Sequence, residues 1–376
     1  MRVLALVPSI YDTSPGQRFR IEQWEPLLRK HGVELTYRPF ECEELHSLIS
    51  RPGNASRKIW LIGKGFLRRI DHLLRARNYD AVYVFREAAV LGPAIFERWT
   101  RSSGVPVVFD FDDAVFVPYK SPSNGYLSML KFPGKTRAIC RLSAHVMAGN
   151  PYLADYARQV NSNVTIIPTT IDTDKYPAAV AKTSAEAPVI GWSGSFSTIQ
   201  HLDILRGALQ RLARQERFKL RVIGTPRYEL NGVEVHSMPW RAETEVTDLQ
   251  PIDIGIMPLP DDLWSRGKCG LKALQYMALG IPTVCSPVGV NTDIIQDGKN
   301  GFIAGDEDAW VKKLTHLLRS VELRRELGMA GRKTVEEQYS AAVQAPRVAE
   351  IFKSVAGEAP SPNRARETMM SEELRN

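Results

Sequence analysis

Lys268 and Lys272 stand four residues apart at the beginning of a predicted helix. The helix is expected because Leu271, Leu274 and Ala278 recur at helical spacing after a glycine-containing loop. The start of a helix leaves backbone N–H groups free and presents the positive end of the helix dipole, which suits a phosphate or carboxylate. Lysines at i and i+4 share one helix face and would add two positive charges there. The alternative is a buried helix with two solvated lysines.

A carboxylate cluster follows the apolar stretch 105–109. Asp110, Asp112 and Asp113 would repel one another unless a cation, an arginine or a shared proton compensates. Carboxylates at such a place could act as hydrogen-bonding or base groups toward a bound hydroxyl. The alternative is a local salt-bridge network that fixes the loops. Three arginines from neighbouring strand-end loops are expected to neutralise the cluster or to bind an acidic ligand: Arg18, Arg20 and Arg86. Glu87, beside Arg86, is a further candidate of the same region.

Residues suited to binding also follow three predicted strands in the second half of the chain. Gly194 and Ser195 follow the strand 189–192, and a strand, a Gly-Ser loop and a helix form a turn that suits an oxyanion. Arg227 and Trp240 follow the next two strands, where a nucleobase would stack or hydrogen-bond. Helix capping is the alternative role for Ser195, and surface exposure or packing is the alternative for the other two.

Several common catalytic patterns are missing from the sequence. It contains neither a full GxGxxG motif nor a Walker A motif, so dinucleotide binding and P-loop chemistry are poorly supported. A GxSxG motif is absent, which argues against hydrolase chemistry. The seven histidines show no HExxH setting, and none is expected to bind a metal.

An alternation of strands and helices is predicted to position these residues. Apolar strands are expected at 2–7, 33–38, 80–85, 105–109, 144–148, 164–167, 189–192, 218–223, 233–236, 252–256 and 283–285. Helices between them favour parallel sheets covered on both faces. We therefore expect an α/β protein with two doubly wound, Rossmann-like domains and a working cleft between the carboxyl ends of their sheets.

The domain boundaries follow from where the periodicity stops. Residues 169–188 lack periodicity and are predicted to link an N-terminal domain, 1–168, to a C-terminal domain, 189–340. A last helix is expected at about 341–356, and the polar, proline-containing tail 357–376 is expected to be disordered.

The bulk composition is that of an ordinary globular protein. The 376 residues allow two cores, with 44% hydrophobic and 24% charged residues. No apolar run approaches the ~20 residues of a membrane span, and the apolar start is too short for a signal peptide. The four scattered cysteines indicate neither zinc nor disulfides, so a cytoplasmic protein with reduced thiols is expected.

Positive charge is concentrated in residues 51–77, which hold eight Lys and Arg against one acidic residue, Asp71. Apolar residues interleave with them, and 66–77 is amphipathic at helical spacing. Such a segment can lie on an anionic membrane surface, which would place the protein peripherally on the inner face of the membrane. The alternative is a surface helix with a solvated basic face. No nucleic acid partner is expected, because no binding motif accompanies the charge.

The segment from Lys268 to Gly289, followed by Asp297-Gly-Lys-Asn-Gly-Phe302, resembles the donor-binding segment of glycosyltransferase family 4. The match is good at Tyr276-Met-Ala-Leu-Gly-Ile-Pro-Thr-Val284. The resemblance implies the GT-B fold, in which two Rossmann-like domains face each other across a cleft and the last helix crosses back to the first domain. It also implies retaining transfer of a sugar from a nucleoside-diphosphate sugar to a hydroxyl acceptor, with no metal ion and no further cofactor.

This chain departs from the family pattern at four positions. Two family glutamates, which touch the donor sugar and the ribose, fall here on Gly267 and Gln275. An Arg and a Lys that bind the diphosphate in the family fall on Ser195 and Gln200. Gln275 still offers an acceptor and donors to a ribose hydroxyl. We therefore expect the lysine pair described above to supply the positive charge that a departing diphosphate needs.

The resemblance gives each candidate residue a role. The expected donor-binding residues are Gly194, Ser195, Arg227, Trp240, Cys269, Gly270, Leu271 and Gln275, the expected acceptor-binding residues are Arg18, Arg20, Arg86 and Glu87, and the expected catalytic residues are Asp110, Asp112, Asp113, Lys268 and Lys272. A competing interpretation makes the aspartates a DxD metal site for the donor diphosphate, as in single-domain GT-A enzymes.

The expected function is sugar transfer in the biosynthesis of a polysaccharide, glycolipid or other glycoconjugate, with a sugar, lipid-linked or glycan acceptor. Two alternatives remain. A nucleotide-sugar epimerase of the same architecture would turn over donor without acceptor. A non-catalytic subunit, made plausible by the missing family residues, would bind the nucleotide sugar without transfer or hydrolysis.

Overall fold

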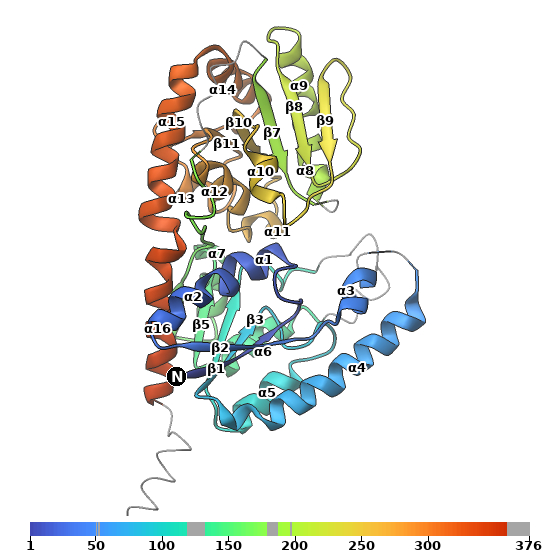
Figure 1. Cartoon of the computed structure of the whole chain (residues 1–376), viewed down its shortest axis with the longest axis vertical. Helices are drawn as coiled ribbons and strands as arrows, with labels where there is room; N and C mark the ends of the chain where they lie inside the picture. Colours follow the sequence, from blue (N-terminus) through green and yellow to red (C-terminus); the bar gives the residue numbers. More distant parts are fainter. Residues whose placement is uncertain (50, 52, 119–131, 179–186, 196–197, 359–376) are drawn as a thin grey trace, which may run out of the picture. The chain divides into compact units, whose positions relative to one another are not determined.

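The structure is a computed structural model that describes the chain except residues 50, 52, 119–131, 179–186, 196–197 and 359–376 (Figure 1). The chain divides into two compact units, one of residues 1–168 with 344 onward and one of residues 169–343. Each unit contains a six-stranded sheet in which every pairing of neighbouring strands is parallel. Helices cover both faces of each sheet, as expected for parallel strands with apolar residues on both sides (Figure 1).

The N-terminal sheet has the strand order β2-β1-β3-β4-β5-β6. Its strands are β1 (Arg2–Val7), β2 (Glu34–Pro39), β3 (Ala81–Phe85), β4 (Val107–Phe111), β5 (His145–Ala148) and β6 (Val164–Ile166). The strand order reverses between β1 and β3, and in such sheets ligands bind beyond the carboxyl ends of the strands at that reversal.

The N-terminal unit also contains α16 (Ala341–Glu358), the last helix of the chain. Its other helices are α1 (Pro15–Gln17), a π-helical turn (Arg18–Glu22), α2 (Gln23–Lys30), α3 (Glu43–Ile49), α4 (Ala55–Leu74), a 3₁₀ turn (Ala76–Asn78), α5 (Ile95–Ser102), α6 (Lys135–Leu142) and α7 (Pro151–Arg158). Phe352 of α16 packs edge-on against Tyr83 of β3, with 6.0 Å between ring centroids. The end of the chain therefore contributes to the N-terminal core.

The C-terminal sheet has the strand order β12-β11-β10-β7-β8-β9, so its order reverses between β7 and β10. Its strands are β7 (Val189–Ser193), β8 (Lys219–Ile223), β9 (Glu234–Met238), β10 (Ile254–Met257), β11 (Thr283–Cys285) and β12 (Phe302–Ile303). Its helices are α8 (Ile199–Asp203), α9 (Arg206–Ala213), α10 (Glu245–Leu249), α11 (Leu263–Arg266), α12 (Leu271–Ala278), α13 (Asn291–Ile294), α14 (Glu307–Arg319), α15 (Val321–Thr334) and a π-helical turn (Val335–Tyr339).

Close packing of α12 on this sheet depends on a glycine in β10. A Cβ at Gly255 would lie 2.4 Å from the ring of Tyr276, so only glycine lets the ring rest on the strand. The Tyr276 hydroxyl accepts a hydrogen bond from the backbone N–H of Ser193 at 2.7 Å. This contact fixes α12 against β7, the strand on the other side of the order reversal.

Two expectations from the sequence need correction. The first part of the predicted linker, 169–188, packs into the C-terminal unit, where Ile171 and Tyr176 are buried. The tail expected to be disordered from residue 357 is helical through Glu358, and 359–376 lie outside the described residues. Within the described chain, the helices are too short or too polar to cross a bilayer.

Candidate active site

The start of α12 lies in a rigid loop beyond the carboxyl end of β10. Gly270, the N-cap, has φ of 70°, and a Cβ there would come within 2.3 Å of Ile294. Glycine is therefore required both by the backbone conformation and by the contact. Cys269 beside it is buried, and its thiol lies 3.8 Å from the carbonyl oxygen of Gly267. Leu271 opens the helix, and the N–H groups of its first turn lack acceptors within the helix.

The two candidate lysines lie above tryptophan rings at this helix start. Lys268 Nζ is 5.1 Å from the ring centroid of Trp264, and Lys272 Nζ is 5.5 Å from that of Trp192. Both side chains are half-buried. Cation–π contacts of this length hold an ammonium group over a ring face.

His201 lies in the same electropositive region, although the sequence pattern gave it no role. Burial lowers the pKa of its imidazole to about 4, with further contributions from the positive charges of Lys272 and Lys268. The side chain is 6% exposed, and its Nδ1 atom has no hydrogen-bond partner within the described part of the chain. A buried, unpaired polar atom carries a free-energy cost unless a ligand or water satisfies it. The only sign of a binding role in the sequence is that His201 directly follows Gln200, the position at which the resembling family has a diphosphate-binding Lys.

The loop after β7 approaches the loop after β8 at van der Waals distance. A Cβ at Gly224, whose φ is 128°, would lie 2.3 Å from the carbonyl oxygen of Gly194. Ser195 is exposed, and its backbone N–H lies 3.0 Å from Thr198 Oγ1. Helix α8 has Thr198 as its N-cap, and the Thr198 side chain makes no capping bond. Gly194 and Ser195 thus form a tight turn beside the order reversal of the sheet.

Gln275 belongs to a chain of buried hydrogen bonds that ends at a tryptophan. Its Nε2 donates to the hydroxyl oxygen of Tyr176 at 2.9 Å, and that hydroxyl donates to Glu245 at 3.1 Å. The indole N–H of Trp240 donates to the second carboxylate oxygen of Glu245, also at 3.1 Å. Tyr176 and Glu245 were missed in the sequence because they lie in the predicted linker and in a short polar helix. The structure thus joins two of the predicted donor residues, Gln275 and Trp240.

Arg227 does not join this network. Its side chain is 84% exposed and pairs with Glu229, its neighbour two residues away, at 2.9 Å. An exposed pair of this kind leaves the guanidinium in water. The structure therefore gives no reason to assign Arg227 to donor binding, and the surface alternative describes it better.

The carboxylate cluster of the N-terminal unit separates into two groups. Asp110 is fully buried and makes a two-pronged ion pair with Arg20, with N···O distances of 2.5 and 3.1 Å. It also accepts a hydrogen bond from the Tyr83 hydroxyl at 2.7 Å. Burial raises the pKa of Asp110, and the Arg20 guanidinium opposes this rise. Because neither side chain reaches the surface, the expected catalytic role of Asp110 and acceptor-binding role of Arg20 are replaced by a structural one.

The second group stands at the surface where β3 and β4 end. Arg86 donates from Nε to Asp112 and from a terminal nitrogen to Asp113, both at 2.7 Å. Its side chain is 27% exposed, against 9% and 15% for the two aspartates. Arg86 has φ of 57°, an uncommon backbone conformation for a residue other than glycine. The order reversal between β1 and β3 therefore carries a partly accessible, charge-compensated cluster.

The remaining acceptor candidates pair with other residues. Glu87 contacts Lys135 at 2.5 Å, and Arg18 contacts Asp12 at 2.7 Å. Across the described residues, no group of three or more His, Cys, Asp and Glu side chains is arranged to hold a metal ion.

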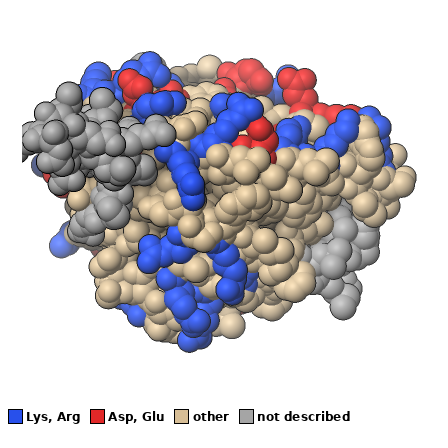
Figure 2. All heavy atoms as spheres, turned by 90° about the horizontal axis from the view of Figure 1, so that it is seen from below, with Lys and Arg blue, Asp and Glu red and all other residues tan. Residues whose placement is uncertain are grey.

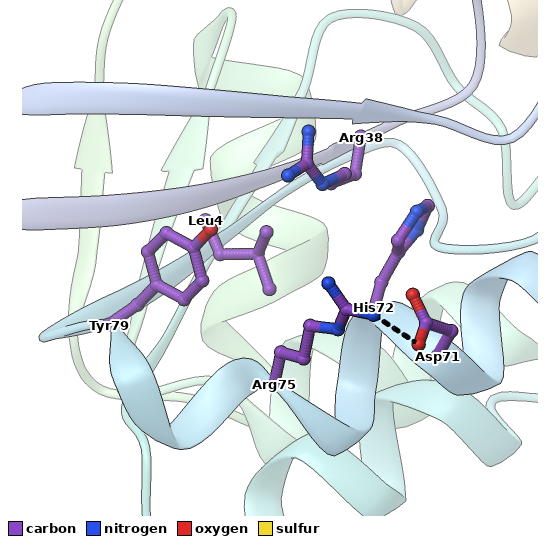
Figure 3. A pocket seen from close by; sticks show the side chains of 6 residues that line it. All are labelled: Leu4, Arg38, Asp71, His72, Arg75 and Tyr79. Carbon is purple, nitrogen blue, oxygen red and sulfur yellow. Dashed lines mark hydrogen bonds and ion pairs between the residues drawn. The ribbon is translucent and has the colours of Figure 1, made fainter.

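A cavity of about 230 Å³ lies elsewhere in the N-terminal unit, between the last turns of α4 and the first two strands (Figure 3). Its lining residues are Leu4, Arg38, Asp71, His72, Arg75 and Tyr79. None of the candidate site residues lines it. Burial lowers the pKa of His72 to about 4, so the positive charge of this cavity at neutral pH comes from its two arginines.

Comparison with solved structures defines the class of protein. The fold resembles that of the sucrose-phosphate synthase of Thermosynechococcus elongatus, with a TM-score of 0.70 and 15% identity over 96% of this chain and 100% of that one. It also resembles Anabaena Alr3699/HepE in complex with UDP-glucose, with a TM-score of 0.62 and 14% identity over 94% and 100% of the two chains. The chain therefore has the two-domain GT-B fold.

Sequence comparison then gives the family. Residues 187–320 match the family of glycosyl transferases group 1. The putative glycosyltransferase EpsD of Bacillus subtilis is 34% identical over 89 residues, which are 23% of each chain. The N-acetyl-alpha-D-glucosaminyl L-malate synthase of Bacillus anthracis is 35% identical over 72 residues, which are 19% of each. These alignments span less than a quarter of the relatives' lengths. Residues 187–320 of the C-terminal unit are therefore similar to the glycosyl transferases group 1.

Proposed function

We propose that the protein is a retaining glycosyltransferase that moves a sugar from a nucleoside-diphosphate sugar to a hydroxyl acceptor. The observation that carries this proposal is the start of α12, where the positive end of the helix lies with two lysines whose charges act on a buried histidine, His201, and the Nδ1 of that histidine has no partner in the described part of the chain. All of them lie in the unit that matches the glycosyl transferases group 1. The complexes of Alr3699/HepE with UDP and UDP-glucose support the nucleotide sugar as donor.

The proposed chemistry is electrostatic. Negative charge grows on the diphosphate as the glycosidic bond breaks, and Lys268 and Lys272 would stabilise that charge together with the helix dipole. The departing diphosphate would help to remove the acceptor proton on the same face of the sugar. No protein nucleophile, metal ion or further cofactor is assigned a role in this scheme, and the protein contributes charge stabilisation and positioning.

The network of Gln275, Tyr176, Glu245 and Trp240 is proposed to hold the nucleoside. Gln275 replaces a family glutamate, and its amide oxygen would accept from a ribose hydroxyl while its nitrogen stays bonded to Tyr176. The ring of Trp240 is half-buried, and its N–H is fixed on Glu245, so one edge of the indole is positioned for contact with a base.

We propose that the N-terminal unit binds the acceptor through Arg86, Asp112 and Asp113. These side chains are partly accessible and stand at the order reversal of that sheet. The basic character of this part of the chain favours a polysaccharide, lipid-linked or otherwise anionic acceptor, in glycoconjugate biosynthesis at the inner face of a membrane.

Thermal-shift measurements with a panel of nucleotide sugars test donor binding, because a ligand of the folded state raises apparent stability by mass action. Transfer to hydroxyl acceptors, with the anomeric configuration of the product read by NMR, then tests the reaction. Turnover of donor without acceptor would favour the epimerase. Binding without turnover for every donor and acceptor would favour the non-catalytic subunit, and absence of binding would overturn the proposal.

A further inference from the structure

Helix α4 presents an apolar stripe to the solvent. Its buried face consists of Lys58, Leu61, Ile62, Gly65, Arg69 and Leu73. The large apolar residues of the opposite side are exposed by 36–68% of their surface, and their spacings of one, seven, three and four residues keep them on one side of the helix: Ile59, Trp60, Leu67, Ile70 and Leu74. A helix that buries two cationic side chains and exposes five large apolar ones is inverted relative to an ordinary surface helix. Such an exposed patch indicates an interaction surface.

The two buried cations explain how α4 can be held with its apolar stripe facing the solvent. Arg69, fully buried, donates to the carbonyl oxygens of Arg38 at 2.8 Å and Val7 at 3.1 Å. Lys58 donates to the carbonyl oxygen of Arg51. These bonds pair the terminal nitrogens of Arg69 and the ammonium of Lys58 with backbone carbonyl oxygens, while Arg69 Nε has no partner in the described part of the chain. The buried pairing of both cations holds the stripe outward.

Helix α5 extends the patch. It packs beside α4 through stacking of Phe66 on Phe96, whose ring centroids are 5.7 Å apart. Ile95 and Trp99 on α5 are 58% and 37% exposed. The apolar surface therefore spans two neighbouring helices, which lie together on the lower side of the N-terminal unit (Figure 1).

Positive charge borders the apolar residues. Lys64 and Arg57 lie over the ring of Trp60, with distances to its centroid of 3.7 and 4.4 Å. Arg68 and Arg75 continue this row along α4, and Arg98 and Arg101 are exposed on α5. Figure 2, viewed from below, shows Lys and Arg side chains set in a largely uncharged surface, with the acidic side chains toward one edge of the view. Within α4 and α5, both fully described, Asp71 is the one exposed carboxylate, and it pairs with Arg75 at 3.0 Å.

We propose that this α4–α5 surface (Ile59, Trp60, Leu67, Ile70, Leu74, Ile95 and Trp99 with the bordering cations) docks on an anionic lipid bilayer. The apolar side chains would enter the interface between headgroups and acyl chains, and the cations would contact lipid phosphates. Tryptophan suits the boundary between headgroups and acyl chains, because its ring is mostly apolar while its indole N–H can bond to polar groups or water. Neighbouring lysine and arginine side chains would reach the lipid phosphates of the same layer. Charge complementarity selects an anionic bilayer as the occupant. The inference does not depend on sugar transfer.

Vesicle flotation with the full chain tests the proposal. Wild-type protein is expected to float with phosphatidylcholine vesicles that contain roughly a third phosphatidylglycerol, and to bind pure phosphatidylcholine at least about tenfold more weakly. Leu67→Glu with Leu74→Glu is expected to lower the partition coefficient at least about tenfold. The matched control is Val321→Glu with Met329→Glu, which changes two residues of similar exposure on α15 and is expected to bind like wild type.

Charge is tested separately with Lys64→Gln and Arg98→Gln, each expected to weaken binding to anionic vesicles about fivefold. Circular dichroism and the thermal midpoint show whether each variant is folded. Equal binding to both vesicle types, or unchanged binding of the double leucine variant, would overturn the proposal. So would a wild-type dimer in light scattering that the leucine variant converts to monomer, since the surface would then bind a second copy of the chain.

Discussion

Gln275 Nε2 donates a hydrogen bond to the hydroxyl oxygen of Tyr176, 2.9 Å away and 99 residues distant in the chain. The hydroxyl proton of Tyr176 is already directed to Glu245. Position 275 must therefore donate, and glutamine can do so while a carboxylate cannot. This relationship gives a physical reason for glutamine at a position where the resembling family has glutamate.

Gln275→Glu is expected to destabilise the protein by about 1–3 kcal/mol. Two buried carboxylates would compete for one hydroxyl proton, and one would lose its partner. Combining it with Glu245→Gln should recover much of the loss, because the amide then donates to Tyr176 from the other side. Urea denaturation of the two single variants and the double variant measures the coupling. Additive losses would show that the three side chains do not act as one network.

Removal of Arg20 is expected to be costly because Asp110 would stay buried without its partner. Arg20→Met should lower the free energy of unfolding by about 3–5 kcal/mol. Arg158→Gln, which removes an exposed pair with Asp155, should cost about 0–1 kcal/mol in the same assay. Similar losses in both variants would show that the buried pair has no special role.

The same variant has an expected pH dependence. Burial raises the pKa of Asp110 above its ordinary value of 3.8, so without Arg20 the folded chain holds the carboxyl proton more tightly than the unfolded chain. A group with a raised folded pKa gains stability as pH falls. The deficit of Arg20→Met relative to wild type should therefore shrink between neutral pH and pH 4, as measured by urea midpoints at both values.

His201 is expected to titrate far below an ordinary histidine. Its pKa is lowered to about 4 from the ordinary 6.5, so the unfolded chain binds its proton first and the stability contribution is lost as pH falls from about 6.5 to about 4. Bound UDP should raise this pKa, because a diphosphate beside the ring favours the imidazolium. NMR titration of the His201 ring with and without UDP checks both statements, with His201→Gln identifying the signal. A pKa unmoved by bound UDP would place the diphosphate elsewhere.

Much of the fold could be predicted because its signals are local. The apolar spacing of Leu271, Leu274 and Ala278 gave α12, and the alternation of strands and helices gave two parallel sheets. The partners of the polar residues could not be predicted. Arg20 meets Asp110 across 90 residues, and Gln275 meets Tyr176 across 99, so no local pattern relates them. His201 acquires its unusual pKa from burial and from distant lysines, neither of which the sequence around it displays.

Lys268 and Lys272 are proposed to stabilise the negative charge that grows on the departing donor diphosphate, so removal of either charge should lower turnover. Lys272→Ala should lower kcat about tenfold to a hundredfold under saturating acceptor, since the charge it stabilises is greatest in the transition state. Lys312→Ala, which removes an exposed lysine on α14 outside the candidate site, should leave turnover unchanged. Steady-state kinetics with the identified donor measure both variants. Unchanged turnover of Lys272→Ala would refute the assignment.

Gly224 provides a purely geometric test of the turn at Gly194. Its φ of 128° disfavours any side chain, and a Cβ would lie 2.3 Å from the Gly194 carbonyl oxygen, a backbone atom that cannot rotate away. Gly224→Ala should therefore displace the turn and weaken nucleotide-sugar binding, in addition to a stability loss above that of an ordinary left-handed position. Gly232→Ala is the comparison variant, because its φ of 80° carries the ordinary left-handed penalty, about 1–2 kcal/mol, with nothing within 4 Å of the added carbon. Thermal midpoints with and without donor separate the two effects. If both variants lose the same stability and keep the same donor-induced shift, the close approach of the two loops does not shape the binding site.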